Sequence, residues 1–287
     1  MSTTHQRDHS KYSASGSHRW LNCAASVALE EQSPPSPDNP FSLEGTQAHA
    51  VLEVLFKLRE LSPLWSAFNY VQLNERDPMV RFGLDMVDTV RTIFHGLPGA
   101  ELLVEKRIYN TSIHPEMFGT VDAAIVQEFG ELHVFDYKYG KSLVKAEKNT
   151  QMIQYALGLA EKFDWNFSTV SMHIYQPRVG LDAHSVWTIP LEDLKGFWLP
   201  VFKSGVARTL AESPRAFAGH HCFWCRAKSI CPLKEENKTT KAFEIFGAQP
   251  LEDEHGEKES SKENKKESGQ KSKSRKKNSD NLEAIFG

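Results

Sequence analysis

Two acidic residues and a lysine stand at spacings that could do chemistry on a phosphate ester. Asp122 lies in one strand-like run, and Asp136 and Lys138 lie two residues apart in the next run. Alternate side chains of a strand share a face, so pairing of the two runs would bring both carboxylates and the ammonium together. Paired carboxylates repel each other unless a cation lies between them. The pattern predicts a divalent-metal site, and its alternative is an ordinary cross-strand ion pair.

Such a site could hydrolyse a phosphodiester bond. A bound cation lowers the pKa of water and polarises a phosphate oxygen, while Lys138 would orient that water or stabilise charge in the transition state. Two further pairs, His49 with Glu53 and Gln151 with Tyr155, are each four residues apart in helix-like runs and therefore share a helix face. The alternatives are a packed histidine and ordinary helix residues.

The joint pattern resembles the PD-(D/E)xK nuclease superfamily, in particular its RecB-like branch. The resemblance spans residues 49–175 and rests on His49, Asp122, Asp136-x-Lys138 and Gln151-x-x-x-Tyr155. It implies that Lys138 is the catalytic lysine and that Gln151 and Tyr155 position the DNA strand and the site. It also implies that Mg²⁺ or Mn²⁺ is bound by His49, Asp122, Asp136 and the backbone carbonyl of Tyr137. An imidazole ligand favours Mn²⁺, and Glu105, then Glu53, are candidates to support these ligands.

The four cysteines are divided unevenly along the chain. Cys23 stands alone, whereas Cys222, Cys225 and Cys231 form a C-x₂-C-x₅-C group. Four thiolates suit either a structural Zn²⁺ or an iron–sulfur cluster, and the spacing alone does not decide between them. The remaining alternative is four separate free thiols that bind no metal. The division of one and three resembles iron–sulfur RecB-type nucleases, namely the AddB nuclease domain and the CRISPR-adaptation exonucleases, including stand-alone phage members. That resemblance implies a [4Fe–4S] cluster that ties the chain ends together.

Hydrophobic periodicity and turn residues predict the elements that must position these groups. The expected fold is α/β, a PD-(D/E)xK restriction-endonuclease-like core with a central mixed sheet flanked by helices, its N- and C-terminal segments joined by the four-cysteine cluster. Asn149 or Thr150 is expected to cap the central helix. Helices are predicted at 43–61, 79–95, 150–163 and 191–211, and strands at 101–109, 120–127, 132–138, 170–175 and 185–189.

Composition sets outer limits on the protein. The chain has 287 residues, 40% apolar and 25% charged, with a net charge of −3, which fits one large or two small globular domains. No run approaches the roughly 20 apolar residues of a membrane helix, and the first ten residues lack a secretory core, so a cytoplasmic protein without membrane contact is expected. DNA binding would need a local basic groove. Candidates are Lys141, Lys145 and Lys148 beside the site, and Lys11, His18, Arg19 and Trp20 near Cys23. Phe223 and Trp224 are expected to pack around the cluster.

The predicted organisation has four parts. Residues 1–10 form a flexible N-terminus, 11–247 the nuclease domain, 248–281 a disordered charged linker, and 282–287 a docking peptide for a single-strand-binding or annealing protein, or simply a solubilising tail. The predicted function is a metal-dependent DNA exonuclease that acts on single strands or duplex ends in recombination, replication or repair. The alternatives are a non-catalytic DNA-binding scaffold and a zinc-stapled adaptor.

Overall fold

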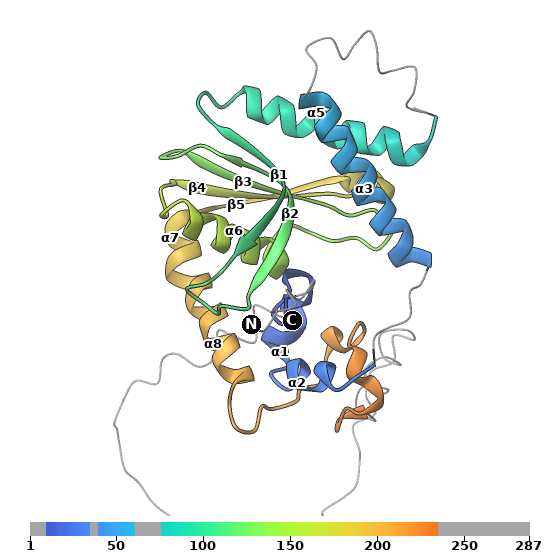
Figure 1. The fold of residues 1–287 in the computed structure, drawn as a ribbon, viewed down its shortest axis with the longest axis vertical. Coiled ribbons are helices and arrows are strands. Elements are labelled where there is room, and N and C mark those ends of the chain that lie inside the picture. Colours follow the sequence, from blue (N-terminus) through green and yellow to red (C-terminus); the bar gives the residue numbers. More distant parts are fainter. Residues whose placement is uncertain (1–9, 35–39, 61–75, 235–287) are drawn as a thin grey trace, which may run out of the picture.

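The computed structural model describes residues 10–34, 40–60 and 76–234 (Figure 1). The predicted flexible N-terminus, except Ser10, the charged linker 248–281 and the docking peptide 282–287 lie outside the described residues, so these assignments stay predictions. No helix within the described ranges is long and apolar enough to cross a membrane.

A five-stranded mixed sheet forms the centre of the molecule, with the strands in the order β1-β2-β3-β4-β5. Only the β3–β4 pair is parallel, because α6 connects these two strands, and the other three pairs are antiparallel. The α/β fold predicted from the sequence is therefore confirmed. The strands are β1 (Glu101–Tyr109), β2 (Phe118–Val126), β3 (Glu131–Tyr137), β4 (Thr169–Tyr175) and β5 (His184–Pro190).

Two layers of helices cover the sheet (Figure 1). The helices α3 (Pro40–Glu60) and α5 (Pro78–His95) pack on one face, where their apolar side chains meet Ala123, Ile125 and Phe135 of the sheet. The helix α6 (Thr150–Lys162) packs on the other face against Ala124 and Val134. The site described below lies where α3 and α6 both approach the strands.

Local sequence explains where these helices begin. Asn149 caps α6, since its side chain accepts hydrogen bonds from the backbone of Gln151 (3.1 Å) and Met152 (3.3 Å). Asp77 caps α5 in the same way, directly before Pro78 at the first helical position. The predicted helix at 191–211 is instead α7 (Leu191–Asp193), a π-helical turn (Leu194–Trp198) and α8 (Leu199–Thr209).

The N-terminal and C-terminal parts of the described chain pack against each other. The short helices α1 (Ser17–Asn22) and α2 (Ser26–Glu31) lie beside the 3₁₀ turns His220–Cys222 and Arg226–Ser229 (Figure 1). Backbone N–H groups of Ala25 and Arg226 donate to Arg215 O (3.0 Å) and to Glu30 Oε1 (3.0 Å). The chain ends are therefore joined by hydrogen bonds within the protein.

Candidate metal-binding site

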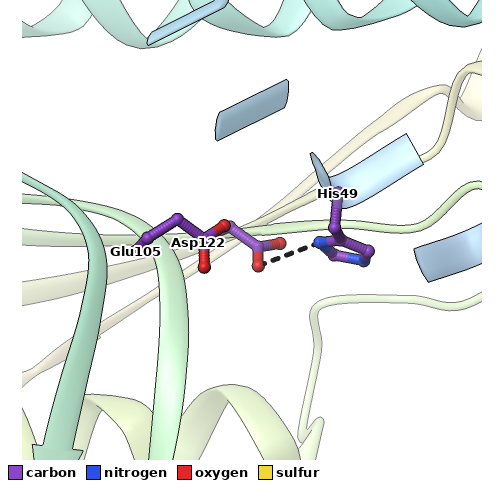
Figure 2. A group of neighbouring side chains, drawn as sticks. All are labelled: His49, Glu105 and Asp122. Atoms are coloured by element: carbon purple, nitrogen blue, oxygen red, sulfur yellow. Dashed lines mark ion pairs between the residues drawn. The ribbon is translucent and has the colours of Figure 1, made fainter. Parts of the chain in front are cut away.

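Three side chains from three different elements converge at one point beside the sheet. His49 comes from α3, Glu105 from β1 and Asp122 from β2, and each has a ligand atom within 4.8 Å of the others (Figure 2). Among the residues that the structure describes, this is the one such group of three histidine, cysteine, aspartate or glutamate side chains. One imidazole and two carboxylates form a donor set that fits a divalent cation.

Asp122 is the fixed member of the group. Its Oδ1 lies 3.1 Å from Nδ1 of His49, and its Oδ2 accepts a hydrogen bond from the backbone N–H of Tyr137 (2.7 Å). The residue is only 7% exposed. Both oxygens are thus held by neighbours, one from α3 and one from β3, so the carboxylate has a defined orientation toward the point where the three side chains meet.

Glu105 reaches the site through an unusual backbone conformation. Its φ angle is 46°, in the left-handed region that a glutamate rarely adopts. The pairs Val104–Ala123 and Lys106–Val121 place Glu105 directly opposite Asp122 on the neighbouring strand. Residues in such conformations cost about 1–3 kcal/mol each and gather at functional sites.

The strained residue marks a break in the alternation of both strands. Leu103 and Ile108 are five residues apart, and Val121 and Ala124 are three apart, yet all four join the hydrophobic cluster on the α6 side. Strict alternation would send the members of each pair to opposite faces. The break falls at the Glu105–Asp122 pair, which frees these two side chains from the regular core pattern.

A second network lies next to this group and contains the remaining predicted catalytic residues. Lys138 Nζ lies 2.8 Å from Asp136 Oδ2 and donates to Gln151 Oε1 (2.9 Å). The amide nitrogen of Gln151 in turn donates to Asp136 Oδ1 (2.7 Å) and to the hydroxyl of Tyr155 (3.3 Å). The four side chains that the sequence assigned to β3 and α6 therefore meet as expected.

Gly119 makes room for this network. A Cβ atom at this position would lie 2.8 Å from Cε1 of Tyr155 and 3.4 Å from Cβ of Ala14. Real Cβ atoms do not approach other atoms as closely as the first distance. The glycine that precedes Asp122 by three residues therefore lets the Tyr155 ring pack directly on β2.

Crowding of carboxylates shifts the pKa values of the site. Burial raises the pKa of Glu105 to about 7, and the charge of Asp122 adds to this effect. Burial also raises the pKa of Asp136; the ammonium of Lys138 opposes the shift, and Asp122 reinforces it. Burial lowers the pKa of His49, but its hydrogen bond to Asp122 and the nearby negative charges outweigh burial, so the net shift is upward. The acidic members therefore repel one another, and a cation would relieve this repulsion.

The arrangement differs from the sequence expectation in one respect. Glu105 was expected only to support the ligands, whereas it lies within the group of three; Asp136 was expected as a ligand, whereas its carboxylate contacts Lys138 and Gln151. No sequence signal identifies Glu105 as a ligand, because neither its positive φ angle nor the β1–β2 register that sets it opposite Asp122 can be read from residue types. The other candidate, Glu53, forms an ion pair with Lys57.

The predicted cysteine centre lies in the joined chain ends. Burial raises the pKa of Cys222, and the nearby thiols of Cys23 and Cys231 raise it further. No three Sγ atoms of these four described cysteines lie within 4.8 Å of one another. Burial raises the pKa of Cys225; Glu30 and Cys222 add to this shift, and Arg19 opposes it. None of the four cysteines, all of them in the described part of the chain, forms a disulfide bond.

Two aromatic predictions near the cysteines need correction. Trp224 was expected to pack around the cluster, but it is 73% exposed, and its ring contacts that of Phe223 edge-on. Trp20 was a candidate to meet a DNA strand, but it is only 3% exposed and packs edge-on against Tyr12 and Phe202.

The predicted basic path follows directly after Lys138. Lys141, Lys145 and Lys148 are exposed on the segment between β3 and α6. The buried amide of Gln176 holds this segment, since it donates to the backbone of Gly140 (3.0 Å) and Ser142 (2.7 Å). The lysines thus stand on a fixed loop, and their contact with DNA stays a prediction.

The fold and the site together define the class of protein. It is an α/β protein in which a histidine of α3 and two carboxylates of the mixed sheet form a group suited to a divalent cation. The chain belongs to the family described as "Protein of unknown function (DUF2800)", whose model matches residues 9–268.

Two solved structures are similar to the chain at low identity. The crystal structure of SSO0001 shares 16% identity at a TM-score of 0.31, covering 74% of this chain and 95% of its own. The crystal structure of LHK-Exo in complex with dAMP shares 14% identity at a TM-score of 0.30, covering 68% of this chain and 91% of its own. At these TM-scores neither structure assigns a role to any residue here.

Proposed function

We propose that this chain is a metal-dependent nuclease that hydrolyses phosphodiester bonds in DNA. The proposal is carried by one observation: His49, Glu105 and Asp122 converge directly beside the network of Asp136, Lys138 and Gln151. Acidic ligands can hold a metal ion that polarises a phosphodiester and activates water, and an adjacent ammonium can stabilise the negative charge that develops.

The proposed ion is Mg²⁺ or Mn²⁺. His49 and Asp122 would hold it together with Glu105, and Asp136 and the backbone carbonyl of Tyr137 complete the ligand set implied by the family resemblance. An imidazole among oxygen ligands favours Mn²⁺ over Mg²⁺. When bound, such an ion supplies polarisation of a phosphoryl oxygen and a lowered pKa for water.

The protein's own residues would do the rest of the chemistry. Lys138 carries a positive charge beside the site and can orient the attacking water or stabilise the charge that develops on the phosphate. Gln151 holds Lys138 and Asp136 in one geometry through hydrogen bonds of 2.9 and 2.7 Å. Tyr155, whose ring packs beside Gly119, accepts a hydrogen bond from the amide of Gln151 and so helps to hold it. Burial raises the pKa of the Tyr155 hydroxyl, which therefore stays neutral.

We propose an exonuclease that acts on single strands or duplex ends. The exposed lysines between β3 and α6 would follow the phosphates toward the site. A role in DNA recombination, replication or repair rests on the resemblance to RecB-like nucleases.

A degradation assay tests the proposal. The full-length protein, purified anaerobically, is incubated with 5′- and 3′-end-labelled single strands and duplexes in the presence of Mn²⁺, beside Lys138→Ala and the matched surface control Lys203→Ala. Wild type and Lys203→Ala should degrade the DNA, and Lys138→Ala should not. Equal degradation by all three would remove the catalytic claim, and DNA binding without cleavage would support a scaffold instead.

A [4Fe–4S] cluster held by the four cysteines is a second part of the proposal. It is supported by the packing of α1 and α2 against the C-terminal turns, which brings Cys23 and Cys231 close enough to Cys222 to raise the pKa of its thiol. A cluster there would tie together ends that hydrogen bonds already join. The anaerobic protein should be brown, and Cys225→Ala should lose the colour. A colourless protein with one equivalent of zinc would support a zinc staple instead.

A further inference from the structure

A polar cavity of about 420 Å³ lies between the N-terminal segment and the cysteine-bearing turns, away from the group of three ligands. Its size falls in the range of small-molecule sites, about 300–1,000 Å³. The lining contains basic side chains and serine hydroxyl groups. All of them come from the N-terminal segment except Arg226, which lies about 200 residues later in the chain. The residues that matter here are Lys11, Arg19 and Arg226, and Ser13, Ser15 and Ser26.

Ser26 gives the first sign that the cavity is a binding site. Its side chain is 98% buried, yet its hydroxyl has no hydrogen-bond partner among the described residues. A buried hydroxyl without a partner is unfavourable by about 1–3 kcal/mol. Native proteins retain such groups where a ligand or an ordered water completes the bonding.

The charges around the cavity favour an anion. Three basic side chains line it against two acidic ones, Glu30 and Glu31, so the lining carries one net positive charge (3 − 2 = +1). Both carboxylates are already engaged. Glu30 pairs with Arg19 (2.7 Å) and accepts the backbone N–H of Arg226 (3.0 Å), and Glu31 pairs with Lys11 (3.2 Å). The carboxylates therefore hold Lys11 and Arg19 in place beside the cavity, and the guanidinium of Arg226 donates to the backbone carbonyl of Glu30 (3.3 Å).

The cavity also lies close to the proposed catalytic residues. Ser13 and Ser15 flank Ala14, whose Cβ lies near Gly119, and Gly119 in turn contacts the ring of Tyr155. Ser17, two residues before Arg19, donates to Thr150 (2.7 Å), the residue before Gln151. The segment that contributes Ser13, Ser15 and Arg19 to the cavity is thus packed, through Ala14 and Ser17, against residues next to the Gln151–Tyr155 network.

We propose that this cavity binds a phosphate monoester, with Ser26 and the basic side chains as donors. Serine hydroxyls and arginine side chains are common phosphate donors, and a monoester carries about −1.5 to −2 charges at neutral pH. The carrier is a nucleotide, either free or at the end of a DNA strand. The choice of DNA as carrier rests on the proposed nuclease function, whereas the phosphate chemistry rests on the cavity alone.

Binding is measured in EDTA with the full-length protein. Because no divalent metal is then available, the result does not depend on the proposed metal site. The probes are a single-stranded oligonucleotide with a terminal phosphate, at the 5′ or the 3′ end, the same strand with free hydroxyl ends, and a free mononucleotide beside its nucleoside. Wild type should bind the phosphate-bearing member of a pair at least about tenfold more tightly, which corresponds to one hydrogen bond to a charged group. If only the phosphorylated oligonucleotide is preferred over its unphosphorylated form, the ligand is the end of a DNA strand. If the mononucleotide is also preferred over its nucleoside, the ligand is any nucleotide.

Ser26→Ala is the decisive variant. Because the hydroxyl has no partner within the protein, its removal should leave the melting temperature unchanged or higher, and the preference for phosphate should fall about tenfold. The matched control is Ser33→Ala in the turn that follows α2, where the hydroxyl donates to Leu29 O (2.8 Å). This control should lose stability but keep the phosphate preference. Equal binding of phosphorylated and unphosphorylated probes by wild type, or an unchanged preference in Ser26→Ala, would overturn the proposal.

Discussion

His49 and His173 both stand beside the central sheet, but their pKa values shift in opposite directions. His49, half-buried on α3, has a carboxylate as its nearest partner, and the negative charges around it raise its pKa. His173, 4% exposed on β4, has imidazoles as partners on both sides, and burial followed by their charges lowers its pKa to about 3. The partner, more than the degree of burial, decides which form of the imidazole the fold stabilises.

The second region is a row of histidines across three strands. His133 Nδ1 lies 3.0 Å from His173 Nε2, and His173 Nδ1 lies 3.1 Å from His184 Nε2. His133 Nε2 lies 2.9 Å from a carboxylate oxygen of Glu131. These contacts are satisfied together if each neutral imidazole carries its proton on Nε2, an assignment inferred from the network.

The two regions teach different uses of the same side chain. In the row, the ring nitrogens of neighbouring histidines hydrogen-bond to one another. The histidines therefore stabilise the sheet as neutral polar groups. At the candidate site, His49 pairs with a carboxylate instead, and the carboxylates of Glu105 and Asp122 lie close together, an arrangement that is unfavourable without a cation or a proton between them. The contrast can be tested by changing one region at a time.

The largest effect is expected for Asp122→Asn. The change keeps the shape of the side chain but removes the charge that His49 and the ion would share. Partners that only support metal ligands typically change affinity about 10- to 100-fold, so loss of a direct ligand should weaken Mn²⁺ binding and cleavage more than about 100-fold. Thermal unfolding with and without Mn²⁺ measures the first effect, since an ion at 100 times its Kd stabilises by about 2.7 kcal/mol.

Asp193→Asn, an exposed aspartate in α7, is the matched control and should keep the full stabilisation by Mn²⁺. The same metal-induced stabilisation in Asp122→Asn would mean that the ion, if any, binds elsewhere. The row of histidines should be unaffected by either change.

A second prediction concerns acid and the histidine row. The pKa of His173 falls from 6.5 in the unfolded chain to about 3 in the folded protein. Between these values the unfolded chain holds a proton that the native protein lacks, so stability is present above pH 6.5 and is lost as the pH falls. The loss is up to about 1.4 kcal/mol per pH unit, or about 2–3 kcal/mol between pH 6.5 and 4.5.

His173→Gln should reduce this slope by about one proton, because glutamine keeps hydrogen-bonding groups but does not titrate in this range. Urea unfolding at a series of pH values gives the slope. His95→Gln, at the exposed end of α5, should leave the slope as it is in wild type. An identical slope in wild type and His173→Gln would show that the row does not hold its imidazoles neutral.

A third prediction gives the pH dependence of the metal site. The pKa of Glu105 is raised to about 7, first by burial and then by Asp122, and a cation must displace the proton that Glu105 holds below this pH. Mn²⁺ affinity should therefore fall as the pH drops below about 7, by about tenfold per pH unit for each proton displaced. His49, with its raised pKa, adds to this dependence.

Glu105→Gln removes one of the two competing protons. The variant should bind Mn²⁺ more weakly at pH 8 and show a shallower fall between pH 7 and 6. Calorimetric titrations in two buffers of different ionisation enthalpy count the protons released. An unchanged number of released protons in Glu105→Gln would exclude this side chain from the ligands.

Much of this arrangement could be predicted from the sequence. Periodicity located β1 at residues 101–109 and the other strands to within two residues, because each strand is bounded by turn residues and buried on one or both faces. A spacing of two put Asp136 and Lys138 on one strand face, and a spacing of four put Gln151 and Tyr155 on one helix face. The meeting of the two pairs was implied by the family resemblance.

Other features could not be predicted from residue types. Glutamate gives no sign of a positive φ angle, so the break in alternation at Glu105 was invisible, and with it the full group of three ligands. Helices α1 and α2 have six residues each, too few to show a period, and they form through contacts with residues about 200 positions later. The π-helical turn at Leu194–Trp198 likewise interrupts a run whose pattern is helical throughout.

The smallest effect is expected at Arg178, which connects the metal site to the rest of the sheet. Its guanidinium donates to Glu44 of α3 (2.8 Å) and to the backbone carbonyl of Tyr139 (3.2 Å), one residue after Lys138. Glu44 precedes His49 by five residues on α3, so this bridge fixes the helix that carries His49 over the strand that carries Lys138. Arg178→Gln should weaken Mn²⁺ binding by up to about tenfold, the lower end of the range for groups that orient ligands.

The pair is partly exposed, with side chains 19% and 39% accessible, so global stability should change little. Arg178→Lys restores the charge but not the second hydrogen bond, and it should recover part of the affinity. Arg208→Gln is the matched control, because Arg208 donates to Leu21 O (2.8 Å) far from α3 and should not alter Mn²⁺ binding. If Arg178→Gln and Arg208→Gln bound Mn²⁺ equally well, His49 would be held in place by the packing of α3 alone.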